Sequence, residues 1–189
     1  MKTAVSIITI IFTFLSARAQ SDVEKLLFSD INKYRVSKGL QTLKWDSSAY
    51  NASKHHANYL SIINNTKNHA GLISHDEKID IENFQEYNVD DRIKFFIPKN
   101  KNNVENVASG GVPNFLGKEN VTSQDSVISK IIFDMWKTSK GHNINMKVKN
   151  FNLGACAISY SESIITFNTA LGTKTRTIKS YYAVFVAYY

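Results

Sequence analysis

The sequence predicts an α+β protein in which the helices come first and an antiparallel sheet comes last. Before residue 140, apolar side chains recur at the three- and four-residue spacing of amphipathic helices. After residue 150, β-branched and aromatic runs are separated by turn residues, as in neighbouring strands of a sheet. Because the two patterns do not alternate along the chain, βαβ units are not predicted.

The first predicted helix runs from Asp22 to Ser37. Ser21 and Glu24 have the spacing of a capping box, in which each side chain accepts a hydrogen bond from the other residue's backbone amide. Apolar residues follow at helical spacing, and Gly39 ends the pattern.

A short extended link through Leu43 and Trp45 leads to a second predicted helix. Asp46 or Ser47 is placed to cap this helix, because short polar side chains accept hydrogen bonds from the free amides of a first turn. The apolar and small positions of the helix run through residues 49–63.

The middle of the chain is polar and irregular from residue 64 to residue 105, with one short helix expected at Asp90–Phe96. Val104–Gly111 is expected to form a tight segment that ends in a glycine pair. Ser123 is then expected to cap a strongly periodic helix, which Lys140-Gly141 ends.

The C-terminal part predicts strands that form an antiparallel meander. Its three β-branched and aromatic runs are Phe151–Tyr160, Ser163–Leu171 and Ser180–Tyr189.

The N-terminus has the three parts of a secretory signal peptide. Lys2 supplies a positive charge, Ala4–Leu15 is apolar and uncharged, and Ala17-Arg18-Ala19 has small residues at the cleavage positions. We therefore expect a signal peptide of residues 1–19 and one exported domain of residues 20–189. The alternative is an uncleaved membrane anchor, but the apolar run is shorter than the roughly 20 residues that span a bilayer. The mature chain is expected to lack a transmembrane segment, to be secreted or periplasmic, and to be a monomer.

Charge and cysteine content restrict the class of partner. The formal net charge is +7, and the loss of two basic residues with the signal peptide leaves +5 (+7 − 2). The lysines are scattered, so nucleic acid is not expected as a partner, whereas weak attraction to an anionic envelope surface stays open. The single cysteine, Cys156, excludes an intramolecular disulfide, and its apolar neighbours predict a buried side chain rather than a nucleophile.

The five histidines do not form a known metal or hydrolase motif, since H-E-x-x-H and G-x-S-x-G are both absent. The histidines at positions 55, 56 and 69 are interpreted as structural or surface residues. The candidates for chemistry, which spacing alone does not establish, are His75, Glu105 and His142.

An ordered set of short fragments covers nearly the whole mature chain. It includes Ile31-Asn32-Lys33-Tyr34-Arg35, Ser74-His75, Glu105-Asn106-Val107-Ala108-Ser109-Gly110, Trp136…Ser139-Lys140-Gly141-His142…Asn145 and Leu153-Gly154. In this order the fragments resemble the CAP superfamily, which contains cysteine-rich secretory proteins, antigen 5 and pathogenesis-related 1 proteins. The resemblance is strongest to its bacterial, cysteine-poor branch.

The resemblance implies an α-β-α sandwich around a central antiparallel sheet, with a cleft that usually carries two histidines and two glutamates. By position, His75, Glu105 and His142 match three of these residues, and Ser139 stands where eukaryotic members have the second glutamate. Other departures are Lys140, where proline is common, and a longer segment after His75.

The function implied by the resemblance is that of an extracellular binding or interaction module whose cleft takes a lipid, an envelope component or a protein. No cofactor is required, but His75 and His142 are candidate zinc ligands, since imidazoles and a carboxylate can hold Zn²⁺ with an open position. Two alternatives stay open. One is a metal- or histidine-dependent hydrolase that uses His75, Glu105 and His142. The other is a structural envelope protein whose polar cluster ties the sheet to the helices.

Overall fold

The computed structural model of the chain describes residues 21–64, 74–78, 84, 88–112, 121–169 and 172–189. The predicted signal peptide, its cleavage site before Gln20, and His69 lie outside the described residues. Within the described residues, no helix is both long and apolar enough to cross a lipid bilayer.

The described elements follow one another in an order that places most helices before the main strands. They are α1 (Asp22–Ser37), β1 (Lys44–Trp45), α2 (Ser47–Ile63), α3 (Val89–Phe96), β2 (Asn103–Gly111), α4 (Val121–Thr138), α5 (Lys140–Met146), β3 (Leu153–Thr169) and β4 (Gly172–Tyr188).

The strands form one sheet with the order β1-β3-β4-β2. β4 pairs antiparallel with both β2 and β3, and the two-residue β1 is parallel to β3. β2 is therefore an edge strand of the sheet. The candidate site residue Glu105 lies on this strand.

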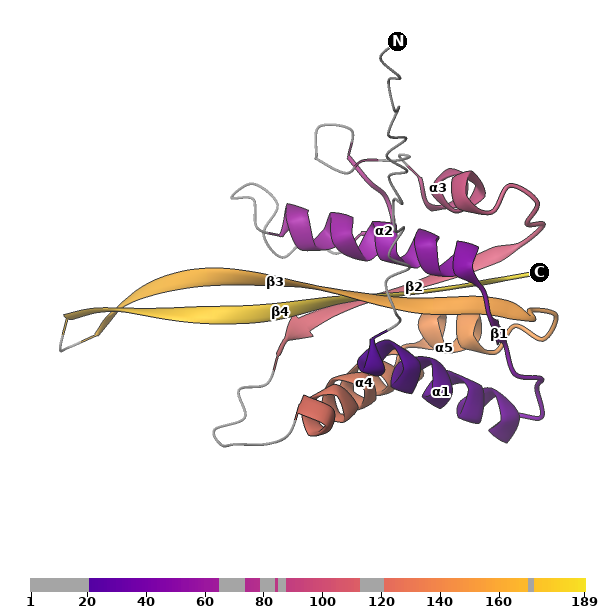
Figure 1. Cartoon of the computed structure of the whole chain (residues 1–189), viewed down its shortest axis with the longest axis horizontal. Coiled ribbons are helices and arrows are strands. Elements are labelled where there is room, and N and C mark those ends of the chain that lie inside the picture. Colours follow the sequence, from indigo (N-terminus) through magenta and orange to yellow (C-terminus); the bar gives the residue numbers. More distant parts are fainter. Residues whose placement is uncertain (1–20, 65–73, 79–83, 85–87, 113–120, 170–171) are drawn as a thin grey trace, which may run out of the picture.

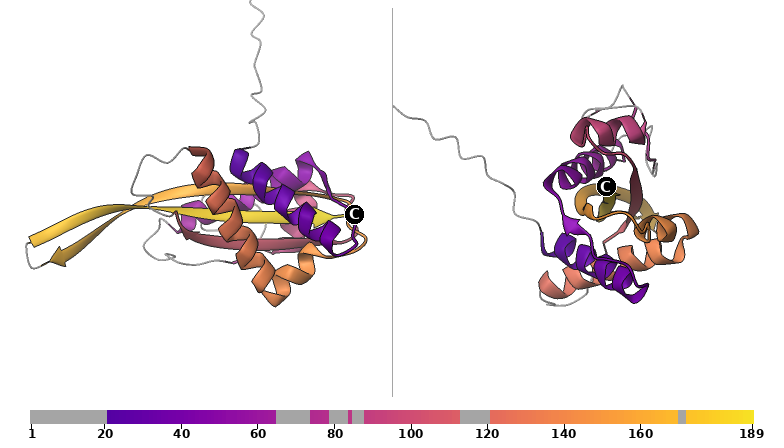
Figure 2. Two further views of the ribbon diagram at one scale, coloured as in Figure 1. Left: turned by 90° about the horizontal axis from the view of Figure 1, so that it is seen from below. Right: turned by 90° about the vertical axis from the view of Figure 1, so that its right-hand side faces the viewer.

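Helices cover both faces of this sheet, with α2 and α3 on one face and α1, α4 and α5 on the other (Figure 1; Figure 2). The β4 side chains alternate between the two interfaces, because successive strand residues point to opposite faces. Phe185 belongs to the core on the α1 and α4 side, whereas Val184 and Val186 belong to the core on the α2 side. The predicted α-β-α sandwich is confirmed.

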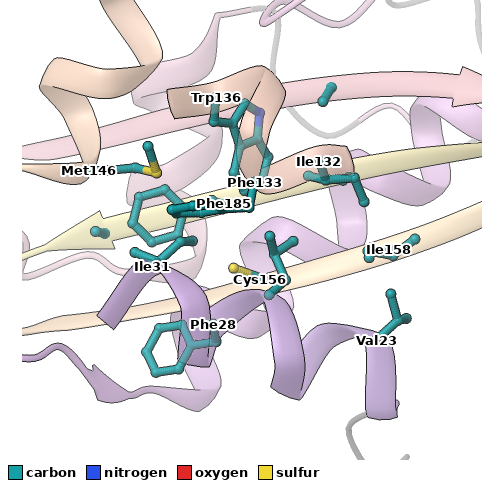
Figure 3. Close-up of a cluster of buried hydrophobic side chains, with 14 of the residues drawn as sticks. Val23, Phe28, Ile31, Ile132, Phe133, Trp136, Met146, Cys156, Ile158 and Phe185 are labelled. Carbon is teal, nitrogen blue, oxygen red and sulfur yellow. The ribbon is translucent and has the colours of Figure 1, made fainter. Parts of the chain in front are cut away.

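The core under α1 and α4 is aromatic and sulfur-rich. Figure 3 shows Trp136 of α4, Phe185 of β4 and Met146 of α5 gathered in one cluster. Cys156 is fully buried in the same core, and burial raises the pKa of its thiol well above 9.0. The prediction that Cys156 is buried is confirmed.

The local signals for the first two helices are confirmed. The Ser21 hydroxyl accepts from the Glu24 amide at 3.4 Å, and the Glu24 carboxylate accepts from the Ser21 amide at 3.0 Å. The other Glu24 oxygen accepts from the Ile158 amide at 2.8 Å, which ties the start of α1 to β3. Asp46 caps α2, since its carboxylate accepts from the Ala49 amide at 2.8 Å.

Two expectations about helix ends are wrong. α4 begins at Val121, so Ser123 lies inside the helix instead of capping it. α4 ends at Thr138, and Lys140-Gly141 begins the separate helix α5. The chain turns at Ser139 and resumes helical structure because α5 packs against α4 and β2, and a local breaker signal does not report that packing.

The strand predictions are wrong in number and length. Val104–Gly111 lies in strand β2, and the C-terminal meander of three strands is a hairpin of two 17-residue strands, β3 and β4. Ser161 to Ser163 is a continuous part of β3, although serine and glutamate there resemble a turn. Backbone pairing with β4 extends through these residues, and the sequence pattern does not record such pairing.

Candidate functional site

Glu105 is the centre of a polar cluster between β2, α2 and α3. Its side chain is only 1 % exposed, and each of its carboxylate oxygens has a hydrogen-bonding partner within the protein. Oε1 lies 2.9 Å from Nδ1 of His75, and Oε2 accepts a 2.5 Å hydrogen bond from the Arg92 guanidinium. β2 places Glu105 on the α2 side of the sheet, because its neighbour two positions along, Val107, belongs to the core on that side.

Arg92 of α3 contacts several members of this polar cluster. Its guanidinium is fully buried and also donates to the His75 carbonyl oxygen at 2.6 Å. One of its nitrogens lies 3.6 Å from Oε1 of a second buried carboxylate, Glu77. Arg92 therefore connects α3 to β2 and to the segment around His75.

His56 of α2 completes the buried part of the site. Its Nδ1 lies 2.9 Å from Oε1 of Glu77, and its Nε2 lies 2.8 Å from the Ser74 carbonyl oxygen. Nε2 is also 3.8 Å from Oε1 of Glu105. We call the four fully enclosed side chains, His56, Glu77, Arg92 and Glu105, the buried ion cluster.

The buried ion cluster pairs each of its carboxylates with nitrogen groups. Arg92 lies between Glu105 and Glu77, and both ring nitrogens of His56 face oxygen atoms. Such pairing is expected because a buried charge without a partner is strongly unfavourable. His55, on the same helix, adds an Nε2 contact of 3.2 Å to the second Glu77 oxygen.

The electrostatics keep Glu105 ionised. Burial alone would raise the pKa of its carboxyl group, but the positive charges of Arg92 and His56 and the hydrogen bonds from His75 and Arg92 lower it to about 2. Glu105 is therefore a fixed carboxylate acceptor and a weak base.

His75 is the member of the site that reaches solvent, with 46 % of its side chain exposed. The hydrogen bond to Glu105 raises the pKa of the His75 ring, in spite of partial burial, which lowers it. With Nδ1 directed to Glu105, the ring turns its Nε2 edge away from the buried carboxylate, and no described residue bonds that edge. His75 therefore offers a hydrogen-bond donor held in place by buried charge.

This arrangement predicts a pH-dependent contribution of His75 to stability. The ring pKa is higher in the folded chain than its ordinary value of 6.5, so the contribution is complete below pH 6.5 and is lost as pH rises through the folded pKa. Because the ring is partly exposed, replacing His75 with glutamine should cost no more than about 1 kcal/mol. Urea unfolding of both proteins at about pH 5.5 and about pH 8.5 measures the difference, which should shrink at the higher pH. An equal difference at both values would contradict the assignment.

His142 approaches the site from the other face of β2, on α5. The side-chain amide of Asn106 donates to the His142 carbonyl oxygen at 3.0 Å, and the side-chain amide of Asn145 donates to the Glu105 carbonyl oxygen at 3.1 Å. Burial, and then the positive charge of His75, lowers the pKa of the His142 ring. His142 is thus close enough to His75 to interact electrostatically, but no hydrogen bond joins it to His75 or Glu105.

Ser139 occupies the junction of α4 and α5. It is the N-cap residue of α5, and its side chain makes no capping hydrogen bond. The structure gives it no hydrogen bond to the buried ion cluster, so Ser139 does not replace the missing acid as a partner of His75 or Glu105.

The positions of the possible metal-binding side chains are relevant to the prediction that His75 and His142 bind zinc. Among the described residues, no group of three or more histidine, cysteine, aspartate or glutamate side chains is arranged to hold a metal ion. Glu105 already uses one oxygen for His75 and the other for Arg92, so it is placed to orient His75 and not to coordinate beside it.

Three buried residues of the site are not among the candidates that the sequence offers. From the sequence, His56 is interpreted as structural, and Glu77 and Arg92 have no assigned role. They come from α2, from the segment after His75 and from α3, so only the packing of these segments brings them together. An available signal was the placement of His56 among inward-facing alanines, where a polar ring needs polar partners.

Sequence comparison decides the family. The model of the cysteine-rich secretory protein family, CAP, matches residues 28–170. The chain belongs to the CAP family. The match runs from within α1 to the end of β3 and therefore includes every residue of the buried ion cluster, His75 and His142.

Solved structures include two that resemble this CAP chain. An extracellular protein with an SCP domain from Bacillus anthracis shares 15% identity at a TM-score of 0.48, with 85% of this chain and 39% of that chain covered. The outer surface protein from Borrelia burgdorferi shares 17% identity at a TM-score of 0.46, with 85% and 89% covered. The CAP chain thus spans less than half the length of the Bacillus anthracis protein. No curated protein matches the chain by sequence.

Proposed function

We propose that this CAP domain is an exported binding module that takes an acidic group of its ligand at His75. The observation that carries the proposal is the half-exposed ring of His75, whose Nδ1 is bonded to the buried carboxylate of Glu105. A ring held in this way and carrying two protons directs an Nε2 donor toward solvent. Hydrogen bonds from a charged donor to a carboxylate or phosphate are stronger than neutral ones.

The charge around His75 supports an acidic ligand. The carboxylates near the ring already have partners inside the protein, since Arg92 contacts both Glu105 and Glu77 and His56 contacts Glu77. The whole chain is basic, which favours an approaching anion. A lipid headgroup, an envelope component or an acidic segment of a protein would each supply the required oxygen.

A hydrolase has less support from the same residues. Glu105 has a pKa of about 2 and both of its oxygens are engaged, so it is poorly suited to accept a proton. Cys156 is buried away from the site, and Ser139 makes no hydrogen bond to a histidine of the cluster. A purely structural role fits the buried ion cluster but gives no reason for the outward edge of His75.

The proposal is tested with small probes that carry the expected chemistry. Acetate and inorganic phosphate are titrated into the full domain while the histidine ring resonances are followed by NMR. We expect saturable shifts of the His75 and His142 rings that weaken as pH rises through the raised pKa of His75, and we expect the His142 shift to disappear in His75→Gln. His55→Gln is the matched control, because His55 contacts the same cluster but is only 13 % exposed. Saturable shifts that persist in His75→Gln would reject the proposal.

Zinc binding by His75 and His142 is a separate prediction. Nδ1 of His75 already faces a carboxylate, which is the usual outer partner of a zinc-bound histidine. With two imidazoles available, we expect binding much weaker than the roughly 10–16 kcal/mol of structural zinc sites. Calorimetric titration of zinc into the wild type and the His75→Ala/His142→Ala double variant measures it. A heat that is the same in both proteins would show that zinc binds elsewhere.

A further inference from the structure

The hairpin of β3 and β4 continues well beyond the body of the domain. Its outer part, residues 162–169 and 172–179, extends past the ends of the helices as a two-stranded ribbon, which we call the arm (Figure 1; Figure 2). β2 ends at Gly111, opposite Ser180, and β1 pairs only at Leu153 and Gly154. The Val112 backbone amide still donates to the Lys179 carbonyl oxygen at 2.7 Å, and beyond this contact the arm lacks a third strand on either edge among the described residues.

A two-stranded ribbon that no other layer covers exposes surface that a binding partner can contact. Two-stranded hairpins without a packed face are marginally stable in water. In the arm, the described side chains are exposed apart from the half-buried Ile178, and Ile164 is 75 % exposed. Threonines fill much of the sequence of the β4 half, so the arm has no core of its own.

The arm has a distinct charge. The arm contains three basic residues, Lys174, Arg176 and Lys179, and one acidic residue, Glu162. Its formal charge is therefore +2 (+3 − 1). No described carboxylate forms an ion pair with any of the three cations, and Lys179 lies over the Tyr160 ring at 4.9 Å. These charges are therefore available to an external anion.

The register places basic and apolar positions together. Arg176 pairs with Ile165, and Lys174 pairs with Phe167. Paired positions of an antiparallel ribbon share a face, and residues two apart along a strand share it too. Two basic positions of the arm are thus paired with two apolar positions in the backbone register.

We propose that the arm docks this CAP domain onto a lipid bilayer with anionic headgroups. The basic positions match the negative surface of such a bilayer, and the apolar positions match the boundary of its acyl region. A second copy of the chain fits less well, because two arms of charge +2 would repel each other. This surface is separate from His75, so the failure of either proposal leaves the other standing.

Vesicle co-sedimentation tests the docking. The full mature domain is mixed with vesicles of phosphatidylcholine alone and with vesicles of equal parts phosphatidylcholine and phosphatidylglycerol. We expect binding to the anionic vesicles, and each lost cation should weaken it about fivefold, so Lys174→Gln/Arg176→Gln should weaken it about 25-fold. The control is Lys99→Gln/Lys149→Gln, which removes the same charge from exposed lysines in the loops before β2 and β3, at the far end of the sheet.

A second variant tests whether the arm itself contacts the lipid bilayer. Phe167→Trp places a fluorescent ring near the turn, and its emission should shift to shorter wavelength with anionic vesicles beyond any change in the wild type. Equal loss of binding in the control pair, or binding unaffected by Lys174→Gln/Arg176→Gln, would overturn the proposal. A dimer by light scattering that the arm variant converts to a monomer would also overturn it, in favour of a second copy as occupant.

Discussion

Replacing Arg92 with methionine should lower the free energy of unfolding by about 3–5 kcal/mol, as breaking a buried ion pair does. Arg92 is fully buried between the two carboxylates of the buried ion cluster. Methionine fills similar space but leaves Glu105 and Glu77 with less positive charge nearby. It also leaves the His75 carbonyl oxygen without its 2.6 Å donor.

Urea unfolding followed by circular dichroism measures this change, with Lys94→Met as the matched control. Lys94 is on the same helix, but its side chain is 57 % exposed and its contact with Asp91 is 3.9 Å, so its loss should cost less than about 1 kcal/mol. The double variant Arg92→Met/Glu105→Gln should recover part of the loss, because it removes the charge that Arg92 neutralises. Single and double variants that lose the same stability as Lys94→Met would show that the cluster contributes little.

Replacing Arg35 with methionine should cost about 3 kcal/mol or more, because buried acceptors left without donors each cost about 1–3 kcal/mol. Arg35 of α1 is fully buried and donates to four backbone carbonyl oxygens. The distances are 2.9 Å to Gln41, 2.8 Å to Met146, 3.1 Å to Val148 and 3.0 Å to Phe151. The side chain thus joins α1 to the loop before β1 and to the connection between α5 and β3.

Two variants separate hydrogen bonding from loss of charge at this position. Arg35→Lys keeps the charge but lacks the planar fork of donors, so it should recover only a part of the stability that Arg35→Met loses. Lys33→Met, on the exposed side of α1, is the control and should cost less than about 1 kcal/mol. If Arg35→Lys were as stable as the wild type, the four carbonyl contacts would not be the source of the effect.

The candidate site could be predicted only in part from the sequence. The family resemblance named His75 and Glu105, and these two residues are in direct contact. It also named His142, which lies on α5, and Ser139, which lies beside it. Neither residue forms a hydrogen bond with His75 or with the side chain of Glu105. Neither resemblance nor spacing indicated how Glu105 is neutralised, because Arg92 and His56 come from two different helices.

The sequence by itself determined the features that depend on neighbours along the chain. The bounds of α1, the capping box of Ser21 and Glu24, and the Asp46 cap of α2 follow from side chains within four residues of one another. The burial of Cys156 followed from an apolar run. In each case the deciding interaction is local, so the pattern of residue types is sufficient.

The tertiary structure alone decided the extent of the strands and the composition of the site. β3 and β4 continue through serine, threonine and glutamate because each strand supplies the other's backbone hydrogen bonds, whatever the side chains are. The buried ion cluster exists because α2, α3 and β2 meet at one edge of the sheet, where charges distant in sequence must neutralise one another. Pairing and burial are properties of the folded chain, and local sequence does not encode which distant residues will share them.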